Sequence, residues 1–212
     1  MTTDLAAAAP AAASTPAPAG LKRQLHWATR AYHQFLLARA QMPFAWGEND
    51  CALFAADGIL AMTGVDIAAD FRGKYSDEAG ALEAIKTVAG GSNIADAAAY
   101  CAQKHGLGQW PHPLKAQRGD LVVIMESGRL IAGLVHLNGS DVVSVGQSGL
   151  LRIPVMQIQC AWHVGPASTP ATDRYKFTPQ PMPAPRLSTT PAPVKALPNP
   201  LIPANAVRKT HV

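Results

Sequence analysis

The chain has 212 residues, a formal net charge of +4 and 48% hydrophobic residues, which indicates one folded domain with additional segments. Of its 18 prolines, three precede residue 20, eleven lie from Pro166 onward and four lie between. The sequence therefore predicts a domain over residues 21–165, between an Ala/Pro-rich arm at 1–20 and a Pro-rich extended arm at 166–212. The positive charge belongs to the second arm and leaves the domain near neutrality, so no nucleic-acid binding by the domain is expected.

The cysteines Cys51, Cys101 and Cys160 are few, odd in number and far apart in the sequence. Because no C-x-x-C pair is present, we expect no metal, no cofactor and no disulfide framework. Such cysteine usage fits synthesis in a reducing cytoplasm. No apolar run reaches about 18 residues, which argues against a membrane span, and the Ala-rich N-terminus lacks the basic segment of a signal peptide.

The first predicted helix spans residues 21–40, where apolar residues recur at helical spacing. Its apolar side would comprise Leu25, Ala28, Tyr32, Phe35 and Leu36. A turn at Gly47 then precedes a second helix, for which Asn49 or Asp50 would be the N-cap and Thr63-Gly64 the stop.

Two further helices are predicted before residue 106. One begins at the acid-rich start Ser76-Asp77-Glu78 and ends at Gly90-Gly91. Its inner face would comprise Leu82, Ile85 and Val88. The next helix runs from Ile94 to His105, and we expect Cys101 to pack inside it.

Strand patterns dominate the second half of the domain. The predicted strands are Leu121–Met125, Leu130–Leu137, Asp141–Val145, Leu150–Val155 and Ala161–Val164. Ser127-Gly128 would join the first two, and Asn138-Gly139 is a strong hairpin turn signal. Helices followed by an antiparallel meander indicate an α+β fold.

Cys51 falls in the first turn of the second predicted helix, directly after Asp50. Unpaired backbone N–H groups and the helix dipole favour negative charge there, which is the position a nucleophilic thiolate needs. The alternative is a small hydrophobic residue that begins a helix. Asp50 has the same two interpretations, as a partner of the nucleophile or as the helix cap.

Four short motifs occur in order along the chain. The sequence W-G-x-x-D-C at 46–51 precedes an apolar helix, and T-G-V-D at 63–66 is followed by F-R-G-K-Y at 71–75. R-G-D-L-V-V begins at Arg118, and A-W-H-V begins at Ala161. Over roughly residues 21–165, the chain resembles the NlpC-type cell-wall peptidases, a papain-like superfamily, and more specifically a poorly characterised bacteriophage-tail branch of it.

The resemblance implies a papain-like, NlpC-like core, in which N-terminal helices pack on a small antiparallel sheet. It also implies that Cys51 is the nucleophile of the Asp50-Cys51 pair. The catalytic histidine of such enzymes opens a strand whose counterpart here begins at Ile131, so the histidine is missing. The residue that orients the histidine would fall near Ser144, which cannot hold an imidazolium as a carboxylate would.

Two histidines remain as substitute bases, His136 and His163. Strand alternation puts His136 on the opposite face from Ile131, so His136 would need a bulge to reach the site. His163 lies on the last predicted strand. Without a base, efficient amide cleavage is not expected, because general base catalysis typically supplies ~100- to 10,000-fold.

The C-terminal arm carries single apolar residues between its prolines. Proline at this density favours extended polyproline II segments, and the apolar residues indicate anchors for pockets on neighbouring chains. The alternative is a solubilising tail. The anchors would be Phe177, Leu187, Leu197, Leu201 and Ile202.

These features predict a structural or assembly component of a bacteriophage tail tip (baseplate), located in the virion and built on a degenerate peptidase fold. Its partners would be hub, distal tail or central tip proteins of the tail. The alternative is a tail-associated peptidoglycan endopeptidase, a cysteine peptidase with Cys51 as nucleophile and peptidoglycan as substrate. The sequence leaves open whether the chain is an enzyme.

Overall fold

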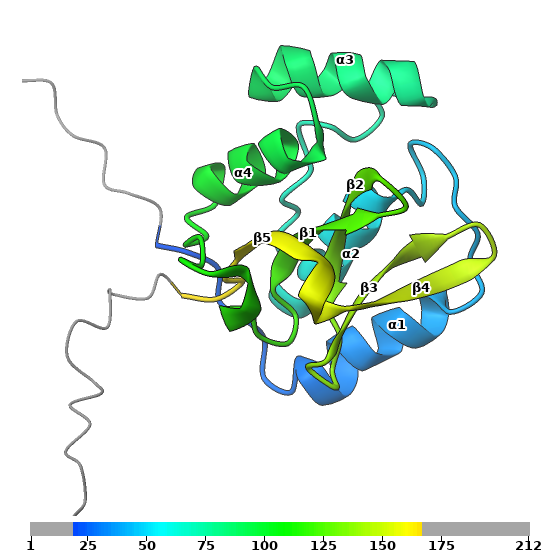
Figure 1. The fold of residues 1–212 in the computed structure, drawn as a ribbon. Helices are drawn as coiled ribbons and strands as arrows, with labels where there is room; N and C mark the ends of the chain where they lie inside the picture. Colours follow the sequence, from blue (N-terminus) through cyan, green and yellow to red (C-terminus); the bar gives the residue numbers. More distant parts are fainter. Residues whose placement is uncertain (1–18, 167–212) are drawn as a thin grey trace, which may run out of the picture. The chain divides into compact units, whose positions relative to one another are not determined.

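The structure is a computed structural model that describes residues 19–166 (Figure 1). Helices precede a five-stranded antiparallel sheet, which makes the fold α+β as expected. Both arms lie outside the described residues except for positions 19, 20 and 166, and so do the five anchor residues of the C-terminal arm. The elements are η1 (Ala28–Tyr32), α1 (His33–Arg39), α2 (Cys51–Thr63), α3 (Glu78–Ala89), α4 (Ile94–Lys104), η2 (Pro113–Lys115), β1 (Leu121–Glu126), β2 (Arg129–Val135), β3 (Asp141–Gly146), β4 (Gly149–Pro154), η3 (Val155–Gln157) and β5 (Ile158–Trp162).

The strand order is β4-β3-β2-β1-β5. Strands β1 to β4 form the predicted meander, with turns at Ser127-Gly128 and Asn138-Gly139, and β5 returns to pair with β1 at the other edge. The ladder between β2 and β3 is short, because it contains only the pairs Leu134↔Val143 and Val135↔Val142. The beginning of β2 and the end of β3 are therefore not paired with each other.

Both faces of the sheet are buried. One face packs on the helices through Val123, Ala132, Leu134 and Val143. The opposite face carries its own cluster, which includes Val122 and Val135 and is covered in part by the segment containing Trp110 and Ala116. A strand residue and its neighbour belong to different faces, so this division fixes which side chains of β2 can reach the helices.

Helix α2 is the central helix and packs directly on β2. Its middle is almost wholly buried, and Phe54 packs against Phe35 of α1 in a tilted arrangement with a centroid distance of 5.1 Å. Gly58 allows the close approach to the sheet, because a Cβ atom there would lie 2.3 Å from Leu134 Cδ1. Helix α3 differs from α2, since it packs mainly on α4 and stands away from the sheet (Figure 1).

The prediction of a helix from residue 21 is wrong at its N-terminal end. Helical geometry begins only at Ala28, and Leu25 is 86% exposed instead of lying on the apolar face. The preceding segment is held by distant backbone partners, because Leu21 N–H donates to Gly165 O and Gln24 N–H donates to Met62 O. His26 also has a φ of +58°, which interrupts a right-handed helix.

The last strand is also shifted relative to the prediction, since β5 begins at Ile158 and ends at Trp162. The next two backbone N–H groups leave the ladder: His163 N–H donates to Gly108 O, and Val164 N–H donates to the carboxylate of Asp120. No helix in the described part of the chain is long and apolar enough to cross a bilayer.

Candidate functional site

Asp50 is the N-cap of α2 and Cys51 is its first residue, as one of the two sequence interpretations had it. Oδ1 of Asp50 accepts hydrogen bonds from the N–H groups of Ala52 and Leu53, both at 3.0 Å. Its Oδ2 accepts from Gly47 N–H at 3.0 Å and from the hydroxyl of Tyr75 at 2.8 Å. With only 1% of its surface exposed, Asp50 is a fully bonded capping carboxylate.

The turn before the helix is held tightly against the segment that carries Tyr75. Gly47 has a φ of +74°, and a Cβ atom there would lie 2.2 Å from the carbonyl oxygen of Tyr75. Only glycine adopts this conformation so close to another backbone without strain. The F-R-G-K-Y motif therefore reaches the turn before Cys51 through its tyrosine, a role that no pattern in the sequence reveals.

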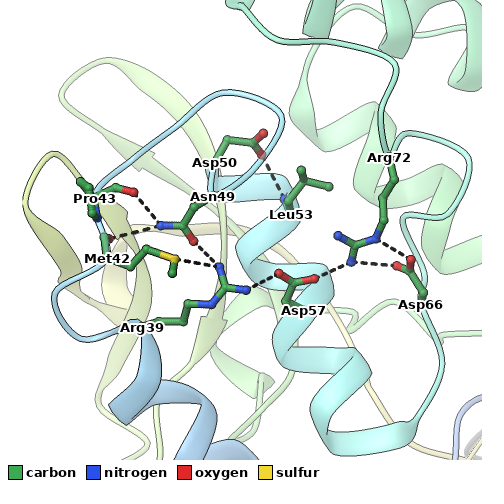
Figure 2. Close-up of polar contacts among 9 residues, drawn as sticks. All are labelled: Arg39, Met42, Pro43, Asn49, Asp50, Leu53, Asp57, Asp66 and Arg72. Atoms are coloured by element: carbon green, nitrogen blue, oxygen red, sulfur yellow. Dashed lines mark hydrogen bonds and ion pairs between the residues drawn. The ribbon is translucent and has the colours of Figure 1, made fainter.

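A network of polar side chains also holds this turn, and it runs from the amide of Asn49 through charged residues of alternating sign (Figure 2). The Asn49 amide donates to the carbonyl of Pro43 at 2.8 Å and accepts from Arg39 Nη1 at 2.6 Å. Arg39 continues to Asp57 in the middle of α2 at 2.7 Å, which is in turn bonded by Arg72. This network ties α1, α2 and the loop between them into one unit.

Arg72 ends the network by holding Asp66 through Nε and Nη2, at 2.5 and 3.1 Å (Figure 2). Burial alone would raise the pKa of Asp66, but the hydrogen bonds from Arg72 and from Ala68 N–H together lower it. The pKa of Arg72 is raised, chiefly by its hydrogen bond to Asp66. The T-G-V-D and F-R-G-K-Y segments are thus structural partners of the helix that carries Cys51.

The thiol of Cys51 is half-buried and faces β2. Burial raises its pKa to about 11, and the charge of Asp50 adds to the rise, whereas hydrogen bonding from the backbone of Ala132 and the helix N-terminus lowers it. At neutral pH these effects together favour the protonated thiol. The helix start alone does not produce a thiolate here.

Ala132 of β2 is the strand residue closest to this chemistry. Its backbone lowers the pKa of the Cys51 thiol, and its carbonyl accepts a hydrogen bond from the buried hydroxyl of Ser144 at 2.7 Å. Both contacts occur where β2 and β3 no longer pair. Ser144, which the sequence places at the position of the orienting residue, instead bridges the two separated strands.

The face assignment of β2 bears on the sequence interpretation of Ile131 and His136. Ile131 packs with the cluster on the face away from the helices and is also among the residues that line the cavity beside Cys51, whereas Ala132 and Leu134 face α2. By alternation His136 shares the face of Ala132, so no bulge is needed. His136 is instead separated from Ala132 by distance along the chain, since four residues of a strand span about 13 Å.

Neither histidine is brought to Cys51. The Nδ1 atom of His136 accepts from Asn138 N–H at 3.2 Å, and its Nε2 lies 3.1 Å from Arg152. His163 packs edge-on against Trp110. Within residues 19–166, no histidine is among the residues that line the cavity beside Cys51.

The second polar cluster of the domain surrounds Asp120, the aspartate of R-G-D-L-V-V. This carboxylate is completely buried and accepts from Arg23 at 2.7 Å, from Trp110 Nε1 at 2.7 Å, and from two backbone N–H groups. His163 Nδ1 lies 3.3 Å from the same carboxylate. The motif thus joins the two ends of the domain to β1 and belongs to the architecture of the fold.

A cavity of about 430 Å³ opens between α2, α3, α4 and the start of β2, with Cys51 in its wall. Its lining is mostly alkyl and aromatic, with Phe71 of the F-R-G-K-Y motif and the exposed Leu82 of α3 among its residues. Cys101 also lines it, and burial raises the pKa of this thiol to about 12. The sequence gives no signal for the cavity, because it forms between elements that are distant in the chain.

A family described as a domain of unknown function, DUF6950, matches residues 22–164. The chain belongs to the DUF6950 family. Every cavity-lining residue of this DUF6950 domain lies inside the matched range, as do both polar networks. No curated protein and no solved structure matches the chain.

Proposed function

We propose that this DUF6950 protein is a non-hydrolytic docking component of a bacteriophage tail tip, built on a degenerate NlpC-like, papain-like core. The observation that carries the proposal is the set of groups around Cys51. Its thiol stands at a helix start against a strand, where a papain-like nucleophile belongs, yet within residues 19–166 no histidine lines the cavity beside it. Burial also raises the pKa of the thiol, and both features fit a fold whose catalytic function has been lost.

Within residues 19–166, no histidine lies beside Cys51 to activate it. A cysteine nucleophile needs a base within hydrogen-bond reach, itself oriented by a third group. Asp50 is already bonded to four donors, and Ser144 is bonded to Ala132. In the described part of the chain, the cavity beside Cys51 contains Ala132 and Leu130 but no imidazole.

The chemistry of the cavity also argues against a peptidoglycan substrate. Peptide stems and sugars carry many hydrogen-bonding groups, and burying such a group without a partner costs roughly 1–3 kcal/mol. The cavity is lined mainly by apolar side chains, and Asp50, Tyr75 and Asn93 in its wall are bonded to one another or to backbone. Cleavage of a polar cell-wall peptide is therefore poorly supported.

The partners in this proposal are neighbouring tail-tip proteins such as hub, distal tail or central tip proteins. The support is the resemblance of the sequence motifs and the apolar residues among the prolines of the C-terminal arm, including Phe177 and Leu201. The location is the virion, after synthesis in the host cytoplasm. Labelling of purified virions with an antibody against the chain tests this, with signal expected at the tail tip and nowhere else on the particle.

The alternative function is a tail-associated peptidoglycan endopeptidase that uses Cys51, and one assay separates it from the proposal. Purified peptidoglycan is incubated with the full chain and with a Cys51→Ala variant, and soluble muropeptides are measured. We expect no release from either protein, with circular dichroism confirming that both are folded. Release by the wild type that the variant loses would refute the non-hydrolytic proposal.

A further inference from the structure

The residues that line the cavity beside Cys51 indicate which kind of ligand it can bind. Its volume of about 430 Å³ lies within the range of ~300–1,000 Å³ that small-molecule sites occupy. Most of its lining consists of alanine, leucine, isoleucine and aromatic side chains. Apolar cavities of this kind exclude water and accept apolar guests.

The polar groups in the wall are already used within the protein. Asp50 binds the hydroxyl of Tyr75 in addition to backbone N–H groups, and Asn93 caps α4 through the N–H groups of Ala95 and Asp96. A peptide or sugar inside the cavity would have to bury its own polar groups without partners. An alkyl chain has no such groups and loses no hydrogen bonds on entry.

One polar pair differs from the others in its exposure. Glu78 at the start of α3 forms an ion pair with Arg129 at the start of β2, and their side chains are 52% and 69% exposed. Both residues line the cavity, so they mark the edge where it meets solvent. A guanidinium carries five N–H donors, so Arg129 can bind a carboxylate in addition to Glu78.

The geometry points to a binding site for a medium-chain fatty carboxylate, with its alkyl chain in the cavity beside Cys51 and its carboxylate at Arg129. Helix α3 forms one wall of this site through Leu82 and Ile85, and it packs mainly on α4. The inference goes beyond the tail-tip proposal and does not rest on it.

The first test compares two of the three free cysteines in the full chain, with decanoate as the ligand. Cys51 lines the cavity, whereas Cys160 is half-buried elsewhere and does not. Alkylation by N-ethylmaleimide at fixed alkaline pH is followed by mass spectrometry of the two cysteine peptides. We expect saturating decanoate to slow Cys51 about tenfold and to leave Cys160 unchanged, since a bound chain covers only the first thiol. Equal rates with and without decanoate, or equal slowing at both cysteines, would overturn the site.

A pair of neighbouring alanines in α4 gives matched variants for the second test. Ala98 is buried and lines the cavity, whereas Ala99 is exposed and does not. By calorimetry, Ala98→Phe should weaken decanoate binding by roughly tenfold or more, because its ring occupies the cavity, and Ala99→Phe should change it by less than about twofold. Thermal melts confirm that both variants fold. Equal affinity of the two variants would place the ligand elsewhere.

The assignment of the carboxylate is tested with Arg129→Gln and with decanol, which has the same chain and a neutral head. The variant should bind decanoate several-fold more weakly and decanol as the wild type does. The same loss for both ligands, or for neither, would refute the role of Arg129. Peptidoglycan release is not a readout of these tests, so failure here is distinct from failure of the docking proposal.

Discussion

Replacement of Asp50 separates its two effects, the capping of α2 and the electrostatic influence on Cys51. Asp50→Ala removes an N-cap worth about 1 kcal/mol and leaves the hydroxyl of Tyr75 and the N–H of Gly47 without their partner, at a further cost of roughly 1–3 kcal/mol. We therefore expect the free energy of unfolding to fall by roughly 2–4 kcal/mol, which is a large fraction of the ~5–15 kcal/mol typical of a domain. Asp50→Asn keeps the capping oxygen but turns an NH2 donor toward Gly47 N–H in place of the second acceptor, so it should keep the cap and still lose part of the second contribution.

Both variants should also change the thiol. The charge of Asp50 contributes to raising the pKa of Cys51 to about 11, so its removal should lower that pKa. Urea denaturation gives the free energies, and the alkylation rate of Cys51 against pH gives the pKa. If Asp50→Ala unfolds at the same urea concentration as the wild type, or if the pKa of Cys51 in Asp50→Asn is not lowered, the capping argument or the electrostatic argument fails.

Three further outcomes follow from the packing and the polar networks. Gly58→Ala should destabilise the fold by about 1–3 kcal/mol, because the added Cβ atom would lie 2.3 Å from Leu134 Cδ1, and unchanged urea unfolding would contradict the close packing. Asp120→Ala should cost roughly 3–5 kcal/mol by leaving Arg23 without its buried partner, measured by thermal unfolding. Since Arg72 lowers the pKa of Asp66, their interaction stabilises the fold above the usual carboxyl pKa near 4 and is lost as the pH falls below it. Arg72→Gln should therefore lose less stability than the wild type on acidification from pH 5, and parallel acid unfolding curves would refute this coupling.

Local features of the fold were predictable from the sequence because their causes lie within a few residues. Asp50 caps α2, and Gly64, with a φ of +79°, ends it, as the motif pattern indicated. The strands were recognisable from alternation and from the turn at Asn138-Gly139. The first helix was misplaced because its expected start is held by Gly165, a residue at the other end of the domain.

The candidate site was less predictable, because it depends on which strand face meets the helices. The sequence correctly placed Cys51 at the helix start. It could not reveal that Ala132, and not Ile131, faces α2, nor that burial would outweigh the helix dipole at the thiol. The cavity forms because α3 and α4 lie near the start of β2, and no local sequence pattern encodes that arrangement.

The backbone contact between the two ends of the domain has a mechanical consequence. Gly20 and Pro166 form an antiparallel bridge, and Leu21 N–H donates to Gly165 O at 3.0 Å, so the chain enters and leaves the domain side by side. Tension applied through the flanking segments would load these few contacts first. The hydrogen-bonded ladders of the sheet would bear load only after these contacts had broken.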